Sequence, residues 1–267
     1  MRFKRIAAII LRHFYLIRGS FSRLFPLFAW VAVDMVLWGL ISRYLNIVAP
    51  AGLNFVAVFL GAVLFWDFFT RVMHGVTTAF FEDVWSRNFL NIFATPLSIW
   101  EYLGGLVLSS IVTSTIGLIV MLVLAFAAFG LSITGFGIAL IPFLLVLFLF
   151  GIALGIFASA VVLRLGPASE WFIWPIPALI SPFVGVFYPI ATLPLWMQYL
   201  SRFLPPSYVF EGMRAIISGS AVSVAQLLLG ECLAVVYLLA ACWFFARIYR
   251  HAVRTGLIAR YSAESVS

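Results

Sequence analysis

Long apolar runs separated by short polar segments dominate the pattern of this chain. Six runs are long enough to cross a bilayer core of about 30 Å at about 1.5 Å per helical residue. They lie near Leu24–Tyr44, Leu53–His74, Ile99–Gly130, Phe136–Leu163, from Trp171 onward, and Val224–Ile248. The fifth run is interrupted around Pro182 and Pro189. The pattern predicts an all-α polytopic membrane protein with six transmembrane helices, forming one transmembrane domain over residues 1–267.

Residues 1–20 have a helical period with one apolar and one basic face. The apolar face holds Phe3, Ile6, Ala7, Ile10, Phe14 and Ile17, and the other holds Arg2, Arg5, Arg12 and His13. Such a helix lies in the membrane surface. We therefore predict an N-terminal interfacial helix that leads into the first span. At the other end, residues 262–267 are polar, and we expect a disordered tail.

The segment 80–98 lies between the second and third runs and is the most charged segment between two long apolar runs. Aromatic residues recur every four positions at Phe81, Trp85, Phe89 and Phe93, which predicts an amphipathic helix with one aromatic stripe. On the other face lie Asp83, Arg87 and Asn91, with Asp83 and Arg87 spaced for an i,i+4 ion pair. The helix is either a docking element for a partner or an interfacial helix on lipid headgroups.

The end of this segment carries stop and start signals. Pro96 disfavours helix at Thr95, which ends the amphipathic helix. Ser98 stands three residues before Glu101, the spacing of a capping box, where the next apolar run begins. We therefore assign Ser98 and Glu101 to capping rather than to chemistry.

Composition supports a membrane protein and gives its orientation. The chain is 65% hydrophobic and 9% charged, which no soluble domain of 267 residues matches. With the N-terminus inside, 13 of the 16 Lys and Arg residues fall in cytoplasmic segments, so both termini are predicted to be cytoplasmic. The net charge of +7 is concentrated at the two ends, as expected for contact with anionic lipid rather than nucleic acid.

Several kinds of chemistry are excluded by residue type. Lys4 is the only lysine, so the chain has no P-loop lysine with which to hydrolyse ATP. Cys232 and Cys242 lie ten residues apart in one predicted helix and cannot bridge each other. The three histidines have no metal-ligand spacing. We predict no catalytic residue, no metal site and no cofactor in this chain.

Residues 181–217 cannot form one simple span, because five prolines interrupt them. Non-helical backbone at membrane depth occurs only where protein or water covers it. We predict a re-entrant pair of short helices that enters from the outer face, the alternative being an outer loop on the lipid interface.

Four charged residues lie within apolar runs, where each needs a partner or water. Asp67 and Arg71 are four residues apart, which favours a structural ion pair on one helix. Asp34 has no local partner and faces either the seam of a dimer or a polar path. For Glu231, pairing across helices with Arg43 or Arg214 is a hypothesis.

Two stretches carry motifs of one known family and together cover about a fifth of the chain. The first is residues 82–98, ending in Phe93-Ala94-Thr95-Pro96-Leu97-Ser98. The second is residues 181–216, with the runs Gly185-Val186-Phe187-Tyr188-Pro189-Ile190, Leu193-Pro194, Pro205-Pro206-Ser207-Tyr208 and Glu211-Gly212-Met213-Arg214. The first stretch resembles the cytoplasmic coupling segment of the ABC type-2 exporter permeases, and the second resembles the outer region of the same family.

The resemblance implies a permease subunit of a bacterial inner-membrane exporter. Two copies would form a path for an amphipathic or lipid-linked substrate, such as a drug, lipid or glycan. Two copies of a separate ATPase, which binds ATP and magnesium, would dock under the coupling helices. The expected coupling residues are Phe81, Glu82, Asp83, Trp85, Arg87, Phe89 and Pro96. The expected residues of the outer hairpin, which would help to close an outer gate, are Tyr188, Pro189, Pro194, Pro205, Tyr208, Glu211 and Arg214.

Within that hairpin, Glu211 and Arg214 either hold the fold or contact substrate directly.

Two rival functions stay open: a non-transporting membrane scaffold or assembly subunit, and a membrane enzyme acting on lipid. The enzyme would require a cluster of acids, histidines or a nucleophile in a loop, and the chain has no such motif.

Overall fold

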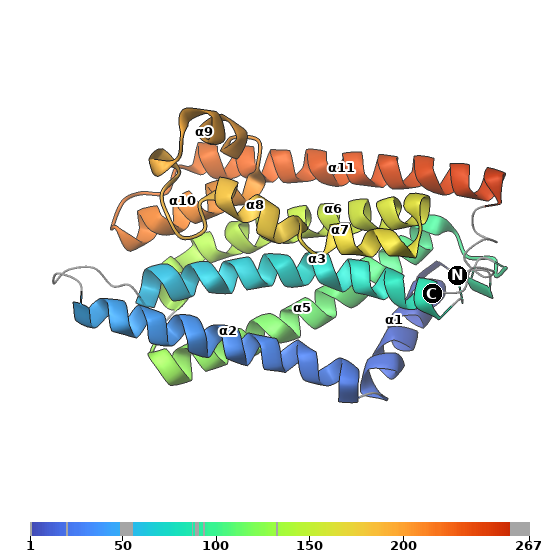
Figure 1. Cartoon of the computed structure of the whole chain (residues 1–267), viewed down its shortest axis with the longest axis horizontal. Coiled ribbons are helices and arrows are strands. Elements are labelled where there is room, and N and C mark those ends of the chain that lie inside the picture. Colours follow the sequence, from blue (N-terminus) through green and yellow to red (C-terminus); the bar gives the residue numbers. More distant parts are fainter. Residues whose placement is uncertain are drawn as a thin grey trace.

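The computed structural model describes residues 2–19, 21–48, 56–86, 88, 91–92, 94–131 and 133–256. Within these residues the fold is a bundle of long helices without strands (Figure 1). Three helices are long and apolar enough to cross a membrane: α5 (Ile99–Phe129), Gly135–Leu165, which includes α6 (Leu140–Leu165), and α11 (Val224–Thr255). Two more have similar lengths, α2 (Phe21–Val48, 28 residues) and α3 (Gly61–Trp85, 25 residues).

The N-terminal helix predicted from residues 1–20 is confirmed as α1 (Arg2–Arg18). It lies at an angle to the long helices, at the end of the bundle where α11 also ends (Figure 1). Its inner side carries Ile9 and His13, both buried, while Phe3 and Phe14 are exposed. Ile9 packs so tightly on α5 that a Cβ added to Gly105 would lie 2.7 Å from it. The exposed apolar side is therefore free to contact lipid.

The centre of the bundle is α6, which packs against both α3 and α11. Gly151 and Gly155 face α3, and a Cβ added to Gly155 would lie 2.8 Å from the Met73 carbonyl oxygen. A Cβ added to Gly151 would lie 2.9 Å from Val72. These small residues therefore allow a close contact between α6 and α3.

The ends of α5 follow the signals in the sequence. Ser98 accepts a hydrogen bond from the Glu101 amide, and the Glu101 carboxylate accepts one from the Ser98 amide, so the predicted capping box is present. Gly130 ends the helix with φ of 67°, a conformation that glycine adopts readily. At 31 residues α5 is about 46 Å long, and it crosses the bundle obliquely (Figure 1).

Short helical turns join several of the long helices. A π-helical turn, η1 (Val56–Leu60), leads directly into α3. Two 3-10 turns, η2 (Ile133–Ala139) and η3 (Pro167–Ser169), precede α6 and α7 (Glu170–Ile173). After α7 come α8 (Ile176–Val184), η4 (Ile190–Thr192), α9 (Leu195–Ser201) and α10 (Pro205–Ile217).

The prolines in this part of the chain act differently from the prediction. Pro182 lies inside α8 instead of ending it, and the helix stops at Gly185, which has φ of 64°. Pro205 begins α10. Proline is tolerated there because an amide at the first position of a helix has no hydrogen-bond acceptor within the helix. Several of the predicted breaks are therefore helix starts.

Candidate functional site

The aromatic residues at the end of the second span belong to α3 itself. This helix ends at Trp85, with Ser86 as its C-cap, so the prediction of one separate helix from Phe81 onward was wrong. Phe81 is 1% exposed, whereas Trp85 is 44% exposed. Phe81 is covered by Trp174, the C-cap residue of α7, with ring centroids 6.1 Å apart. Of the two, only Trp85 is placed to contact a partner.

Asp83, which was predicted to be spaced for an i,i+4 ion pair with Arg87, is fully buried. Its carboxylate instead bonds to the guanidinium of Arg12 on α1 and accepts a hydrogen bond of 2.7 Å from the hydroxyl of Tyr102 on α5. The carboxylate thus joins three helices at the same end of the bundle. It is buried because charge and hydrogen bonds compensate for the lost water.

Two further contacts join α1 to the other helices at this end. Arg5 lies 3.3 Å from the Glu101 carboxylate, so the residue that caps α5 also binds α1. The Nε2 atom of His13 lies 3.3 Å from the Ala79 carbonyl oxygen of α3. These contacts hold α1 across the ends of α3 and α5.

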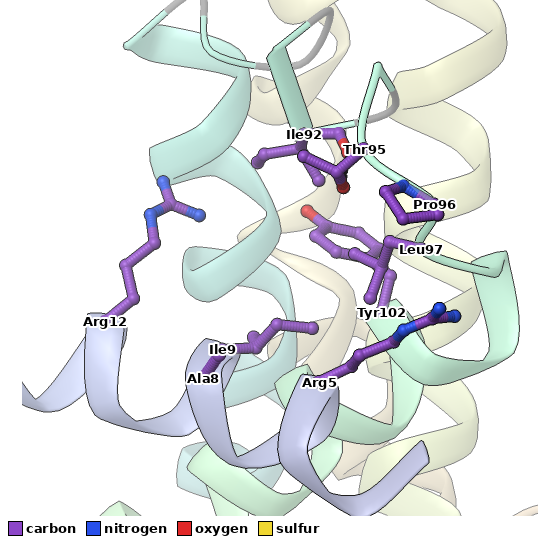
Figure 2. Close-up of a pocket in the computed structure, with 9 residues that line it drawn as sticks. All are labelled: Arg5, Ala8, Ile9, Arg12, Ile92, Thr95, Pro96, Leu97 and Tyr102. Atoms are coloured by element: carbon purple, nitrogen blue, oxygen red, sulfur yellow. Dashed lines mark hydrogen bonds between the residues drawn. The ribbon is translucent and has the colours of Figure 1, made fainter. Parts of the chain in front are cut away.

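A cavity of about 270 Å³ lies between α1 and the turn that precedes α5. Figure 2 shows Arg5, Ile9 and Arg12 on its α1 side, Pro96 on the opposite side, and Tyr102 between them. Pro96 is exposed, as a contact for a partner requires. Arg87 and Phe89, which were also predicted for this surface, lie outside the described residues, as does the tail at 262–267.

An aromatic series extends from this end of the bundle toward its interior. The indole Nε1–H of Trp85 donates to Glu170 of α7 at 3.0 Å. Trp85 contacts Phe81 at 5.5 Å between ring centroids, and Trp174 lies 4.7 Å from His74. A displacement at Trp85 would therefore reach both α7 and the middle of α3 through packed side chains.

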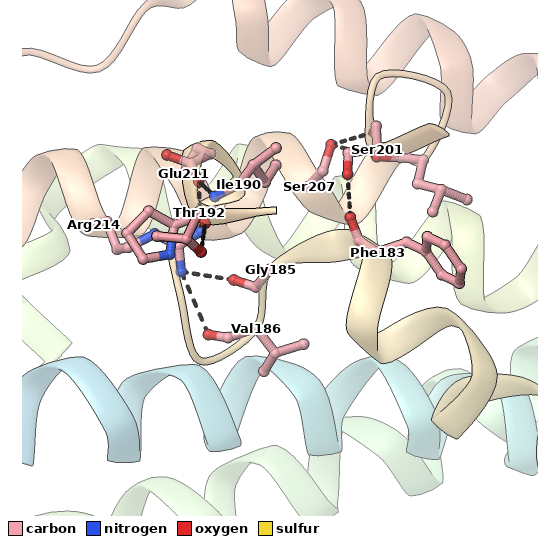
Figure 3. Close-up of polar contacts among 11 residues, drawn as sticks. Phe183, Gly185, Val186, Ile190, Thr192, Ser201, Ser207, Glu211 and Arg214 are labelled. Atoms are coloured by element: carbon pink, nitrogen blue, oxygen red, sulfur yellow. Dashed lines mark hydrogen bonds and ion pairs between the residues drawn. The ribbon is translucent and has the colours of Figure 1, made fainter. Parts of the chain in front are cut away.

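The region 181–217, which was predicted to form the outer hairpin, is held by an ion pair and by backbone contacts. Figure 3 shows Arg214 donating to the carbonyl oxygen of Gly185 at 2.7 Å and to Glu211 at 2.8 Å. The same Glu211 oxygen accepts the Ile190 amide at 2.8 Å. Both side chains therefore fix the turn after α8, which favours the holding role over direct contact with substrate.

Other predicted hairpin residues also make contacts within this region. The Tyr188 hydroxyl donates to the Pro182 carbonyl at 2.8 Å, and the Tyr208 hydroxyl donates to the Arg202 carbonyl at 2.7 Å. Ser201 donates to the Phe183 carbonyl, which joins α9 to α8 (Figure 3). Pro189 and Pro194 are extended residues immediately before η4 and α9.

Comparison with protein families decides the broad identity. The model of the ABC-2 type transporter family matches residues 7–218, which is most of the chain. The chain belongs to the ABC-2 type transporter family. It is therefore a multi-pass membrane permease of a type that works with an ABC ATP-binding subunit. A comparison with the curated proteins found no match.

The intramembrane charges of this ABC-2 transporter chain are arranged differently from the predictions. Asp67 and Arg71 lie four residues apart on α3, and the side chain of Arg71 extends to α5, where a Cβ added to Gly117 would lie 2.5 Å from its Cδ. Asp34 of α2 is half-buried. Arg214 is occupied by Glu211 and backbone carbonyls, and Glu231 forms no ion pair with any described residue, so the proposed Arg214–Glu231 pair was wrong.

Three residues at the Trp85 end of the ABC-2 chain were missed from the sequence. Arg12 was assigned to the lipid surface, while Tyr102 and Glu170 had no assigned role. Arg12 and Asp83 are 71 residues apart, and Trp85 and Glu170 are 85 apart. No local spacing could have identified such pairs.

Proposed function

We propose that this chain is the permease subunit of an ATP-driven exporter that moves an amphipathic or lipid-linked substrate out of the cytoplasm or inner leaflet. Two copies form the path, and two copies of a separate ABC ATP-binding subunit bind at the end that contains Trp85. ATP and magnesium bind to that partner, and this chain catalyses no reaction. The candidate substrate classes are drugs, lipids and glycans.

In the proposed arrangement, α2, η1 with α3, α5, α6, α7 with α8, and α11 make six spans of a bacterial inner membrane. The helices α9 and α10 form a re-entrant hairpin from the outer face. The support for this orientation is that 13 of 16 Lys and Arg residues then lie inside. The end of the bundle that contains α1 and the last turns of α11 is accordingly cytoplasmic.

The observation that carries the proposal is the junction at Asp83. A partner that pushes on the turn at Pro96 also moves the start of α5, because Ser98 and Glu101 cap that helix. Through the bonds of Asp83 to Tyr102 and Arg12, the same displacement reaches α3 and α1. A buried, charged junction resists separation, so the three helix ends move as a unit.

The test is co-expression and co-purification with a candidate ABC ATP-binding subunit, followed by measurement of ATP hydrolysis in lipid. Trp85→Ala is expected to lower both transport and the effect of the permease on hydrolysis, while membrane insertion is unchanged. Trp85→Phe keeps an aromatic ring but removes the N–H that donates to Glu170. Comparing it with Trp85→Ala separates the effect of contact with the partner from the effect of this internal hydrogen bond. Trp243→Ala, at an exposed position on α11, is the matched control.

A permease that binds the ATPase without affecting hydrolysis would favour the scaffold function. Equal rates of ATP hydrolysis with the Trp85→Ala and Trp243→Ala permeases would show that Trp85 does not take part in coupling.

A further inference from the structure

A polar cavity of about 260 Å³ lies where η4, α9, α10 and the start of α11 come together. Seven of the nine residues that line it are polar. Figure 3 shows two of them, Ser207 and Glu211, one turn apart on α10. Tyr208 packs so closely on α11 that a Cβ added to Gly230 would lie 3.2 Å from its own Cβ. This contact brings Gln226, one turn before Gly230, to the cavity.

Most of the hydrogen-bond donors in the cavity wall are already bonded to the backbone. The hydroxyls of Ser207 and Tyr208 donate to backbone carbonyl oxygens at 2.8 and 2.7 Å. The side-chain amide nitrogen of Gln198 donates to two further carbonyl oxygens, at 2.8 and 3.4 Å. A hydroxyl that donates one hydrogen bond can still accept others, and the oxygen of an amide accepts independently of its nitrogen. These three side chains therefore offer acceptors to a ligand.

Two other side chains of the wall keep polar groups open. Glu211 uses its Oε1 atom for both Arg214 and the Ile190 amide, each at 2.8 Å. Its Oε2 atom has no hydrogen bond to any residue that the structure describes. Within the same residues, only the backbone amide of Gln226 is bonded, to Ser223, and its side chain is not. The cavity thus combines several acceptors with one amide that can both donate and accept.

The charges around the cavity favour a neutral ligand. Arg214 neutralises Glu211, and the guanidinium of Arg202 lies over the ring of Tyr199, 5.2 Å from its centroid. The open carboxylate oxygen repels a phosphate, and a carboxylate that is already paired attracts an ammonium group less strongly. A ligand with several hydroxyl groups suits the wall better, because each hydroxyl can both donate and accept. The volume of about 260 Å³ lies near the lower limit of about 300 Å³ for small-molecule pockets, so the ligand is small.

We propose that this cavity binds one monosaccharide unit. The hydroxyl groups of the sugar donate to Glu211, Tyr208 and Gln198, and a sugar oxygen accepts from the side-chain amide of Gln226. In the exporter proposed above, the sugar belongs to the transported molecule, which narrows the substrate to a glycan or a glycolipid. That last step rests on the proposed function, whereas the binding of a sugar requires this chain alone.

The test is saturation-transfer difference NMR on the full chain in phosphatidylcholine nanodiscs, purified without any sugar-based detergent. The probes are D-glucose, D-galactose, D-mannose and N-acetyl-D-glucosamine, each titrated alone, and empty nanodiscs give the blank. Phosphoethanolamine is the probe for a lipid headgroup. We expect a saturable signal from at least one sugar and none from phosphoethanolamine. No signal from any sugar, or a signal from phosphoethanolamine at equal or lower concentration, would overturn the proposal.

Variants then place the sugar in the cavity. Tyr208→Phe and Gln226→Leu each remove one neutral hydrogen-bonding group, so each should raise the Kd of the sugar by about two- to tenfold. Gln226 is exposed in the first turn of α11, so this substitution tests binding without disturbing the packed helices. Tyr188→Phe is the matched control, because its hydroxyl also donates to a backbone carbonyl, at 2.8 Å, but does not line the cavity. Its Kd should equal that of the native chain.

Two results separate this proposal from the proposed function. The same Kd in the native chain and in all three variants would place the sugar elsewhere and overturn the proposal. Sugar binding that weakens as predicted, in a chain on which no ATPase depends, would support the cavity and contradict the exporter.

Discussion

The junction at Asp83 predicts an unusual order of stabilities among variants. Arg12→Leu leaves a carboxylate that is 0% exposed without its cation, and breaking a buried ion pair in this way costs about 3–5 kcal/mol. The double variant Arg12→Leu with Asp83→Leu contains no buried charge at this junction. Its remaining defect is the Tyr102 hydroxyl, which is buried and has lost its acceptor, at a cost of about 1–3 kcal/mol. The double variant should therefore be more stable than Arg12→Leu alone.

A third change completes the series. Adding Tyr102→Phe to the double variant removes the unpaired hydroxyl, so stability should return close to that of the native chain. The assay is reversible unfolding in mixed micelles by titration with a denaturing detergent, followed by tryptophan fluorescence. If the double variant were as unstable as Arg12→Leu, the cost would not arise from an unpaired buried charge. The stable triple variant should still couple poorly to the ATPase, because the three helix ends are no longer bonded.

Two further predictions concern other parts of the molecule. Gly155→Ala should destabilise the chain by about 1–3 kcal/mol, since the new Cβ would lie 2.8 Å from the Met73 carbonyl oxygen. Gly104→Ala is the matched control, because a Cβ added there would lie 3.8 Å from the Ile6 Cδ1, an ordinary van der Waals distance. Equal stabilities of the two variants in the same unfolding assay would contradict the packing argument. In the hairpin, Glu211→Ala should speed hydrogen exchange of the Ile190 amide by roughly ten- to a hundredfold, from the loss of a charged acceptor worth about 1.5–3 kcal/mol. An unchanged exchange rate would show that Glu211 does not hold this turn.

Local signals predicted the helices well. The apolar runs gave the long helices, because a membrane-length apolar stretch has few other stable structures. The capping box at Ser98 and Glu101 was predictable because both partners lie within one turn. The third run was predicted to end at Gly130, and its left-handed conformation closes α5 there.

Long-range contacts were not predictable in the same way. Phe81 fitted an exposed aromatic stripe by spacing alone, yet a buried helix face has the same period. Asp83 had a plausible local partner four residues away, and only the fold brings Arg12 and Tyr102 to it.

The central claim is that the Trp85 end of this ABC-2 transporter chain couples it to an ATPase. The most direct measurement is the rate of ATP hydrolysis by the purified complex in lipid, compared between native, Trp85→Ala and Trp243→Ala permeases. We predict a complex in which Trp85→Ala alone changes hydrolysis and lowers transport. A permease that purifies without an ATPase, or three permeases with the same hydrolysis rate, would contradict the claim.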